Sequence, residues 1–440
     1  MTLSEYLTSL KGKKIAVLGY GVSNRPLVKL LAEAGLEVTV RDKGSLPEIP
    51  GVRCISGEDY LKDLTEDVVF RTPGLRPDLI PLKDGAELTS EMEAFFRLCP
   101  CPILAVTGSD GKTTTTTLIA ELLKAAGKKV WLGGNIGHPL LAETDGVSPE
   151  DAAVLELSSF QLMDLSWRAS AAVITNVRPN HLDWHTDLGE YAEAKKHIFR
   201  GQKPGDLLVL NADDPGSLGC AGEAPGRVRL FSRVTPQPEG AYFDGERVYF
   251  RGEPILERKE IRLPGLHNVE NWMAAICAVY DEVGPEVCRR VAASFNGVAH
   301  RLEPVRTLNG VEYINDSIAS SPSRTAAGLK ALEGRSLVLI AGGYDKHIPY
   351  DDLGPEIAER VRVLVLCGAT APKIKSAVLA APGKKPEIIE KADFAEAVEA
   401  ASKVAKPGEI VLLSPASASF DLFKNFEERG DRFKEIVRGL

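Results

Sequence analysis

The sequence predicts an α/β protein with three domains. Signals for strands and helices alternate along the chain, separated by turns that contain Gly and Pro. The alternation is interrupted twice, near Cys99-Pro100-Cys101-Pro102 and between Asn296 and Arg301. The length agrees, because 440 residues at about 150 per domain give about three domains. We therefore expect domains at residues 1–97, 98–298 and 299–440.

The first domain is predicted to be Rossmann-like, with a parallel sheet. Residues 14–18 (KIAVL) form a short apolar run that ends at Gly19, and a helical stretch closed by Gly35 follows. Residues 37–40 and 68–70 read as the next strands. A strand–helix–strand unit of this length places its two strands in parallel.

The second and third domains repeat the alternation. The second begins with a strand at 103–106 and a helix from about 112 to 126, and residues 228–263 predict a small antiparallel sheet. The third reads as another Rossmann-like α/β domain. The remaining strands are expected at 153–157, 171–175, 207–210, 337–341, 361–366 and 410–413, and helices at 190–199 and 268–280.

Composition excludes several classes of protein. Lys and Arg number 53 and Asp and Glu 61, so the formal charge is −8 and no nucleic-acid partner is indicated. The first residues lack the apolar core of a signal peptide, and no apolar run reaches the ~18 residues of a spanning helix. The seven cysteines form no CxxC pair. We expect reduced thiols, a cytoplasmic location and no membrane insertion.

A glycine turn follows the first predicted strand. In Gly19-Tyr20-Gly21-Val22-Ser23-Asn24, backbone amides at a helix start would suit a phosphate. Asn24 stands where a dinucleotide fingerprint needs Gly or Ala, which weakens an NAD-dependent oxidoreductase interpretation. A site for another nucleotide diphosphate and a purely structural turn both remain open. Asp42, at the end of the second strand, is either a ribose or base contact or a solvated carboxylate.

A phosphate-binding loop follows the strand at 103–106. The loop has the pattern GxxGKT, shorter than the usual GxxxxGK[ST], and it lies between a strand and a helix. Such a loop binds nucleoside triphosphates through backbone amides, a lysine and a hydroxyl that ligates Mg²⁺. The candidate residues are Gly108, Ser109, Asp110, Gly111, Lys112, Thr113 and Thr114. The five threonines from 113 to 117 disfavour a helix, so packing or ligand must hold this turn.

Three further positions could serve a metal. Glu156 ends an apolar run about forty residues after the loop, where a carboxylate could ligate Mg²⁺. The segment from His181 to His185 (HLDWH) reads as a metal cluster or a surface loop. Lys195 lies on a predicted helix, and from its residue type alone it is a solvated charge.

Eight motifs, in this order, resemble those of the Mur ligases. The resemblance as a whole covers roughly residues 14–433, in all three predicted domains, and the last motif is most similar to the branch that adds D-glutamate. The motifs are TGSDGKTTTTTL, VLELSSFQL, NVRPNHLDWH, GLHNVENWMAA, HRLEP, INDSIASSP, GGYDKHIPY and LLSPASASFDLFKNFEERG. Two departures stand out, because Asp110 replaces the usual asparagine of TGxNGK and Ser320 replaces a common threonine.

The resemblance implies an ATP-dependent ligase that joins D-glutamate to UDP-N-acetylmuramoyl-L-alanine through an acyl phosphate, in peptidoglycan precursor synthesis. It implies a P-loop domain of the ATPase type in the middle, two Mg²⁺ ions, and Lys195 carbamylated by CO₂ so that it ligates metal as a carbamate. The chain would be a monomer acting on small molecules. Thr113, Glu156, His181 and carbamylated Lys195 would hold the metals, and the catalytic set would be Lys112, His181, Lys195 and Arg301.

Binding roles also follow from the resemblance. Asn268, Asn271, Arg301 and Asp316 would contact ATP. The UDP-linked substrate would meet Gly19, Gly21, Asp42, Gly74, Asn135 and Ser158. D-Glutamate would meet Ser320, Lys346, Ser419 and Phe426.

Other proteins with a phosphate loop can be compared with this sequence by their characteristic features. A P-loop ATPase that couples hydrolysis to motion explains the loop but not the C-terminal motifs. Folylpolyglutamate synthase shares the loop, but has it nearer its N-terminus without a preceding UDP-type domain. The ligase that adds a diamino acid carries a DNPR motif, which this sequence lacks.

Overall fold

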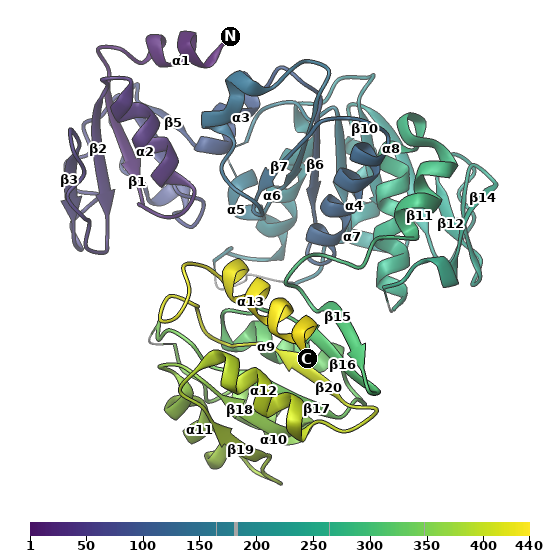
Figure 1. Cartoon of the computed structure of the whole chain (residues 1–440). Helices are drawn as coiled ribbons and strands as arrows, with labels where there is room; N and C mark the ends of the chain where they lie inside the picture. The colour runs from purple at the N-terminus through teal and green to yellow at the C-terminus, as the bar shows by residue number, and fades with distance from the viewer. Residues whose placement is uncertain (164, 180–183, 264, 347) are drawn as a thin grey trace. The chain divides into compact units, whose positions relative to one another are not determined.

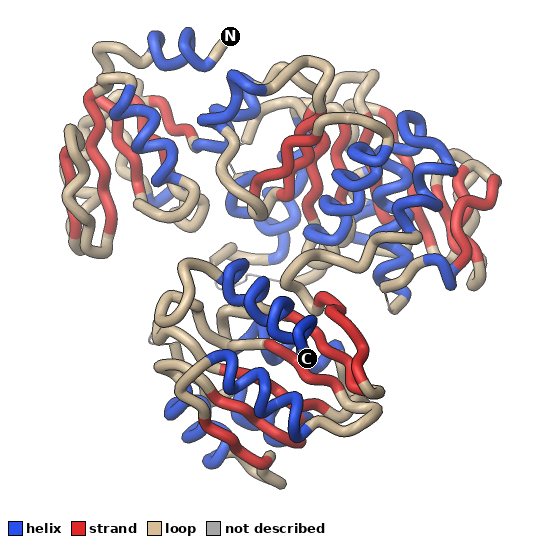
Figure 2. The backbone as a smooth tube through the Cα atoms, in the orientation of Figure 1, coloured by secondary structure: helices blue, strands red, loops and turns tan. Residues whose placement is uncertain are grey.

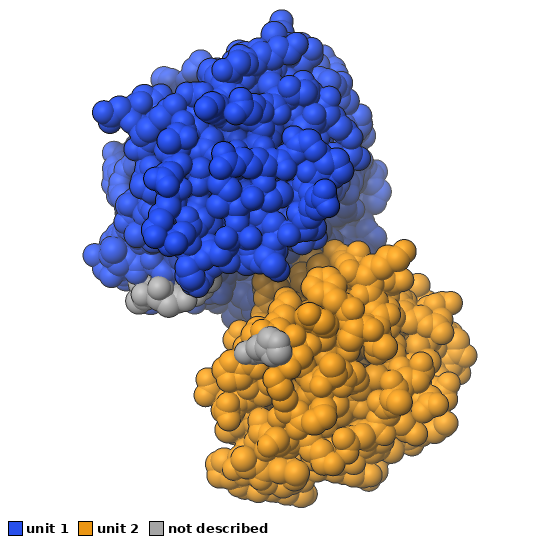
Figure 3. Space-filling view, turned by 90° about the vertical axis from the view of Figure 1, so that its left-hand side faces the viewer, with its two compact units in different colours: residues 1–295 blue, residues 296–440 orange. Residues whose placement is uncertain are grey.

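The computed structural model describes residues 1–163, 165–179, 184–263, 265–346 and 348–440. The chain divides into two compact units, residues 1–295 and 296–440 (Figure 3). Unit 1 contains a five-stranded and a nine-stranded sheet, and unit 2 a six-stranded sheet (Figures 1 and 2). The three-domain α/β fold predicted from the sequence is confirmed, with one sheet for each predicted domain.

The first sheet of unit 1 is entirely parallel, in the strand order β3-β2-β1-β4-β5. Residues 15–18 of β1 are buried, as expected for a strand covered on both faces. Its elements are α1 (Leu3–Ser9), β1 (Lys14–Leu18), α2 (Asn24–Glu33), β2 (Glu37–Asp42), β3 (Arg53–Ser56), β4 (Val68–Arg71), β5 (Glu87–Thr89) and α3 (Glu91–Leu98).

The second sheet of unit 1 has the order β14-β13-β12-β11-β10-β9-β6-β8-β7. Its elements are β6 (Ile103–Thr107), α4 (Lys112–Ala125), β7 (Val130–Gly134), β8 (Ala152–Glu156), α5 (Ser159–Leu162), β9 (Ala171–Ile174), α6 (Leu188–Arg200), β10 (Leu207–Asn211), α7 (Pro215–Leu218), β11 (Arg227–Ser232), β12 (Ala241–Phe243), β13 (Arg247–Phe250), β14 (Glu253–Glu257) and α8 (Leu266–Ala292).

The small antiparallel sheet expected at 228–263 takes a different form. Strands β12, β13 and β14 pair antiparallel, but they extend the main sheet instead of forming one of their own. The first strand of the stretch, β11, pairs parallel with both β10 and β12. Alternation along a strand reports which face is buried and not which neighbour it pairs with, so the sequence pattern did not distinguish these arrangements.

Helices cover both faces of the second sheet. On one face, α4 and α8 form the main core cluster with residues such as Leu104 and Val106 of β6. On the other, Ile103 and Ala105 pack in a cluster with α3 and α6. Helix α3 also contributes to the core of the first sheet, which joins the two sheets of unit 1 through shared packing.

Unit 2 has the strand order β15-β16-β20-β17-β18-β19, parallel except for the β15–β16 pair. Helices α12 and α13 form a core with one face, and α9, α10 and α11 with the other (Figure 1). Its elements are β15 (Glu303–Leu308), β16 (Val311–Asn315), α9 (Pro322–Ala331), β17 (Leu337–Ala341), α10 (Leu353–Arg360), β18 (Val361–Leu366), α11 (Ala371–Ala380), β19 (Glu387–Glu390), α12 (Phe394–Val404), β20 (Ile410–Leu413) and α13 (Phe426–Gly439).

The chain order within unit 2 places three loops side by side. Strand β20 lies between β16 and β17, and all three run parallel. The segments that follow their carboxyl ends therefore meet at one edge of the sheet, where α/β proteins usually bind ligands. Among the described residues, no helix is long and apolar enough to cross a membrane.

Candidate active site

The phosphate loop of unit 1 connects β6 to α4, and its two glycines are required by close contacts. Gly108 has φ +150°, and a Cβ there would lie 1.9 Å from Thr175 Oγ1. Gly111 has φ +79°, and its Cβ would lie 2.3 Å from Asn271 Oδ1. Gly111 is also the residue before α4, and no side chain caps the helix there. The first amides of α4 are thus available to an anion.

Residues that follow β9 form hydrogen bonds to the phosphate loop. Asn176 accepts from the Asp110 amide through Oδ1 at 2.9 Å, and the Thr175 hydroxyl donates to the Asp110 carbonyl at 2.6 Å. The Ser109 hydroxyl lies 3.0 Å from Tyr191 Oη on α6. The loop backbone is therefore fixed by the protein itself, while the Asp110 side chain is exposed. A loop ordered in advance loses less entropy when it binds a ligand.

Lys112 lies over its own loop. Its Nζ donates to the carbonyls of Gly108 and Ser109, both at 2.9 Å. The threonine run that disfavours a helix is accommodated locally, because Thr116 and Thr117 donate to the carbonyls of Lys112 and Thr113, one turn earlier.

Asn268 and Asn271 extend from α8 towards the start of α4. Asn271 accepts from the Thr115 hydroxyl at 3.3 Å and donates to Asn268 Oδ1 at 3.1 Å. Both asparagines are buried. The structure therefore brings these predicted ATP contacts together with the phosphate loop.

Glu156 ends β8, the strand next to β6, and it is buried. Its Oε1 accepts from Asn135 Nδ2 at 2.8 Å, and its carbonyl accepts from the Asn135 amide at 2.8 Å. Its Oε2 is buried and has no hydrogen-bond partner among the described residues. A buried carboxylate oxygen without a donor is costly, and a cation ligand would remove that cost.

Lys195 is the most unusual cation of unit 1. Its side chain is 1% exposed, and Nζ donates to the Gly108 carbonyl at 3.0 Å and to Thr107 Oγ1 at 3.5 Å. Burial, with a smaller contribution from the charge of Lys112, lowers the pKa of Lys195 well below its usual value. The solvated-charge interpretation of this residue is therefore wrong, because the amine lies buried beside the phosphate loop.

A second, partly buried network links the two sheets of unit 1. His185 lies with Nε2 2.9 Å from Ser159 Oγ and Nδ1 3.3 Å from Glu190 Oε2. Glu190, in the first turn of α6, accepts from both terminal nitrogens of Arg76, which comes from the first sheet's domain. Arg76 holds the pKa of Glu190 down to about 2. His181 lies outside the described residues.

The first glycine turn is stabilised by side chains. Asp42 Oδ2 accepts from the Tyr20 amide at 2.7 Å, and Asn24 Nδ2 donates to the carbonyls of Leu18 and Gly19. Asn24 thus braces the turn from the position where a dinucleotide fingerprint has glycine. Gly21 and Gly74 are exposed, and the Gly74 carbonyl accepts from Trp184 Nε1 at 3.0 Å. Ser158 caps α5 two residues after Glu156.

In unit 2, the four predicted amino-acid contacts lie on segments that meet at one sheet edge. Ser320 follows β16, Lys346 follows β17, Ser419 follows β20, and Phe426 begins α13. Ser419 is buried, whereas Lys346 is exposed with Nζ 6.0 Å from the Phe420 ring centre. An isolated bridge between Tyr344 and Ala418 joins the β17 and β20 segments.

Arg301 and Asp316, the predicted phosphate and ribose contacts, also belong to unit 2. Arg301 is exposed, and Asp316 is buried directly after β16. Asp316 accepts from the Ser414 hydroxyl at 2.8 Å and from the Leu302 amide at 3.2 Å. Burial raises the pKa of Asp316 to about 6, and these hydrogen bonds oppose the rise.

Comparison with known proteins identifies the family. Residues 106–279 match the Mur ligase middle domain, and residues 300–417 match the Mur ligase glutamate ligase domain. A UDP-N-acetylmuramoylalanine–D-glutamate ligase of Acetivibrio thermocellus is 50% identical, over 100% of this chain and 99% of the relative. The chain belongs to the Mur ligase family.

Further comparisons support the assignment of this chain to the Mur ligases. A UDP-N-acetylmuramoylalanine–D-glutamate ligase of Clostridium kluyveri is 49% identical over 98% of both chains. The solved structure of MurF from Acinetobacter baumannii matches with a TM-score of 0.59 and 16% identity, over 97% of this chain and 92% of that chain. At that identity the match supports the fold alone.

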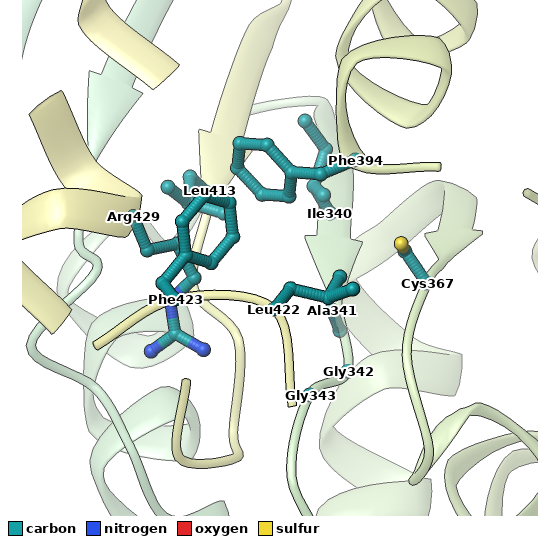
Figure 4. Close-up of a pocket in the computed structure, with 10 residues that line it drawn as sticks. All are labelled: Ile340, Ala341, Gly342, Gly343, Cys367, Phe394, Leu413, Leu422, Phe423 and Arg429. Carbon is teal, nitrogen blue, oxygen red and sulfur yellow. The ribbon is translucent and has the colours of Figure 1, made fainter. Parts of the chain in front are cut away.

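The structure of this Mur ligase adds residues that the sequence reasoning did not single out. Asn176 and Tyr191 hold the phosphate loop, and Arg76 and Glu190 join the two sheets of unit 1. In unit 2, Arg429 of α13 lines a small pocket with Gly343, Phe423 and other residues (Figure 4). Arg429 did carry a signal, since it lies three residues after Phe426 and four before Phe433, on the apolar stripe of its helix.

Proposed function

We propose that this Mur ligase uses ATP to join D-glutamate to UDP-N-acetylmuramoyl-L-alanine, giving ADP, phosphate and a new amide bond. One observation carries the proposal: the chain matches ligases of that name at 46–50% identity along nearly all of both chains. The phosphate loop supplies the matching chemistry, because amide formation from a carboxylate needs activation by phosphoryl transfer. The product is a peptidoglycan precursor.

Mur ligases use ATP, generally with Mg²⁺. The residues around the loop suit both. The amides of residues 108–112 and the Lys112 ammonium would hold the phosphates, and Asn268 and Asn271 would bind on the adenine side. Thr113 and Glu156 would hold Mg²⁺, and that assignment is supported by Glu156 Oε2, which has no hydrogen-bond partner within the described part of the chain. The metal would neutralise charge on the phosphate oxygens.

We propose that Lys195 carries a carbamate and thereby becomes a second metal-binding group. A carbamate forms only on a neutral amine, and burial beside Lys112 favours the neutral form. A carbamate presents anionic oxygen, which a divalent cation prefers to an ammonium group. His181 and a second Mg²⁺ complete this proposal by resemblance.

In the first step the alanine carboxylate attacks the γ-phosphorus of ATP and an acyl phosphate forms while ADP leaves. Two anions meet in this step, so positive charge must gather around them. Lys112 supplies part of it from the loop, and we assign Arg301 a similar role, with Asp316 near the ribose. Asn135, braced on Glu156, would contact the UDP-linked substrate. Gly19, Gly21, Asp42, Gly74 and Ser158 keep the same predicted role.

In the second step the amine of D-glutamate attacks the acyl carbon and phosphate leaves. Lys346 would pair with one carboxylate of D-glutamate and the Ser419 hydroxyl would donate to the other, with Ser320 and Phe426 completing the site. The attacking amine must lose a proton, and His181 is our candidate base.

Phosphate release from ATP, followed with each substrate omitted in turn, tests the proposal. Release should require UDP-N-acetylmuramoyl-L-alanine together with D-glutamate, and L-glutamate and meso-diaminopimelate should not replace D-glutamate. The matched control is the same enzyme with ATP alone. Rapid release with ATP alone would instead support an ATPase that couples hydrolysis to motion.

A further inference from the structure

Arg429 is the most deeply buried guanidinium of unit 2 that contacts loops at the sheet edge. It lies in the first turn of α13 and is 2% exposed. Burial lowers its pKa only to about 10, so it stays charged at neutral pH. Burying an arginine is costly unless hydrogen bonds satisfy its donors. What those donors contact is therefore informative.

The guanidinium donates to two loops at once. Towards the segment after β16, Nε donates to Ser317 Oγ at 3.0 Å and Nη2 to the Ser317 carbonyl at 2.9 Å. Towards the segment after β20, Nη1 donates to the carbonyls of Ser417 and Ala418 at 3.1 and 3.0 Å. None of these four acceptors is a carboxylate, so the positive charge fixes backbone and hydroxyl groups and forms no ion pair with them.

The Arg429 guanidinium is also connected, through other residues, to the segment after β17 and to the start of α13. The Ala418 carbonyl also accepts from the Tyr344 amide at 2.9 Å, on the segment after β17. A Cβ on Gly343 would lie 3.1 Å from Arg429 Nη1 and 2.2 Å from the Ala418 carbonyl. Figure 4 shows Arg429 extending from α13 towards this glycine loop. Finally, the Ser317 hydroxyl donates to the Phe426 carbonyl at 2.8 Å, at the start of α13.

These contacts coincide with the four segments that carry the proposed D-glutamate contacts. Ser317 lies three residues before Ser320, and Gly343 three residues before Lys346. Ala418 directly precedes Ser419, and Phe426 lies one turn before Arg429. A charged hydrogen bond is about twice as strong as a neutral one, and a planar fork adds direction. One side chain therefore sets the spacing between all four segments.

We propose that Arg429 is a positioning residue for the amino-acid substrate: it holds the loops of Ser320, Lys346, Ser419 and Phe426 in the arrangement that binds D-glutamate. The inference rests on the proposed function, which assigns those four residues to D-glutamate. Arg429 itself touches no substrate in this scheme.

The test compares full-length Arg429→Lys and Arg429→Met with the wild-type enzyme in steady-state ligation. Lysine keeps the charge without the fork, and methionine removes both. We expect the KM for D-glutamate to rise about tenfold or more in Arg429→Met and less in Arg429→Lys, as expected for lost positioning. The KM values for ATP and for UDP-N-acetylmuramoyl-L-alanine should stay within about twofold.

Arg362→Met is the matched control. Arg362 is a partly buried arginine of the same unit that pairs with Glu409 through both Nε and Nη2, each at 2.6 Å, near the amino ends of β18 and β20. Because these parallel strands begin at the opposite edge of the sheet, this variant should lower the melting temperature without changing the KM for D-glutamate.

A second readout separates positioning from general damage. Acyl phosphate formed without D-glutamate can be trapped with hydroxylamine, and its rate should be unchanged in both Arg429 variants. An unchanged KM for D-glutamate, or an equal rise in all three KM values, would overturn the inference. If Arg429→Met does not accumulate as folded protein, Arg429→Lys carries the same test. Failure of the wild-type enzyme to use D-glutamate would instead overturn the proposed function.

Discussion

Each unit buries a cation near the carboxyl ends of parallel strands, and the surroundings of the two cations are opposite in kind. Lys195 in unit 1 and Arg429 in unit 2 are both at most 2% exposed. Lys195 has two oxygen acceptors, one of them at 3.5 Å, and a second cation nearby. Arg429 has four acceptors within 3.1 Å.

The number of hydrogen-bond acceptors around each cation indicates whether it can react or whether it holds other groups in place. A poorly solvated amine favours its neutral form, which is nucleophilic and can react with CO₂. A guanidinium surrounded by carbonyls keeps its charge and fixes whatever it contacts. A buried cation with few partners is therefore a candidate for modification, and one with a full set of partners is a candidate for positioning.

The largest effect is expected at Lys195. Lys195→Ala should lower ligation about 10³-fold or more, because a group that stabilises the charged transition state would be lost. The measurement is D-glutamate-dependent phosphate release. Lys196→Ala is the matched control, since the neighbouring lysine forms ion pairs with Glu193 and Glu223 on the surface and should be dispensable.

Chemical rescue distinguishes a carbamate from an ammonium at this position. Small carboxylic acids such as acetate should restore part of the activity of Lys195→Ala, because they place anionic oxygen where the carbamate would lie. Rescue by small amines, with none by acids, would show that the cation itself is needed.

A smaller effect is expected at Lys346. Lys346→Ala should raise the KM for D-glutamate about tenfold to a hundredfold, the range for a lost hydrogen bond to a charged group. The KM for ATP should not change. Lys403→Ala, on the exposed side of α12, provides the control. An unchanged KM for D-glutamate would remove Lys346 from the amino-acid site.

Gly111 tests whether the phosphate loop is as tightly fitted as the loops around Arg429. Gly111→Ala places a Cβ 2.3 Å from Asn271 Oδ1, at φ +79°. We expect the KM for ATP to rise about tenfold and stability to fall by about 1–3 kcal/mol. Gly127→Ala has a similar φ of +92° with nothing within 4 Å of the new Cβ, so it measures backbone strain alone. Equal KM values for ATP in the two variants would exclude a specific fit at Gly111.

A buried carboxyl group, that of Glu91, extends the comparison to the opposite charge. Burial raises the pKa of Glu91 to about 7, although backbone amides of residues 140 and 141 oppose the rise. Between pH 4.5 and 7 the folded chain therefore binds more protons than the unfolded chain, so this contribution to stability declines as the pH increases. At about 1.4 kcal/mol per pH unit, the decline in stability over this range is on the order of 3 kcal/mol.

Thermal unfolding from pH 4.5 to 7.5 measures this effect. The melting temperature of the wild-type protein should fall with rising pH relative to Glu91→Gln, which lacks the titration. Glu33→Gln, on the exposed side of α2, should follow the wild type. A parallel pH dependence in wild type and Glu91→Gln would contradict the raised pKa.

The sequence allowed prediction of the features that one segment encodes by itself. Strands β1 and β6 are apolar runs ended by glycine, and the phosphate loop is a continuous pattern. The sequence analysis missed the short strands β3 and β5. They are the two outermost strands of the first sheet, and their residues are partly exposed. The pairing of β11 and β12 with the main sheet depends on partners distant in the chain, which no local pattern reports.

The candidate sites divide in the same way. The motifs pointed to the phosphate loop, Glu156 and the loops of unit 2, and the structure places Asn268 and Asn271 beside the phosphate loop. The burial of Lys195 could not be judged from a helical lysine, because it depends on how α6 packs against the loop. The role of Arg429 depends on the meeting of segments more than a hundred residues apart.

Helix α13 also has a consequence for the order in which the protein is made. The phosphate loop of unit 1 is complete once α8 has been synthesised. The loops after β16, β17 and β20 are all translated before Arg429, which holds them together. On the proposed roles, a chain that lacks α13 would keep the phosphate loop with Asn268 and Asn271 but lose the hydrogen bonds from Arg429 that join the proposed D-glutamate loops. The arrangement proposed to bind D-glutamate would thus be completed only after the phosphate loop.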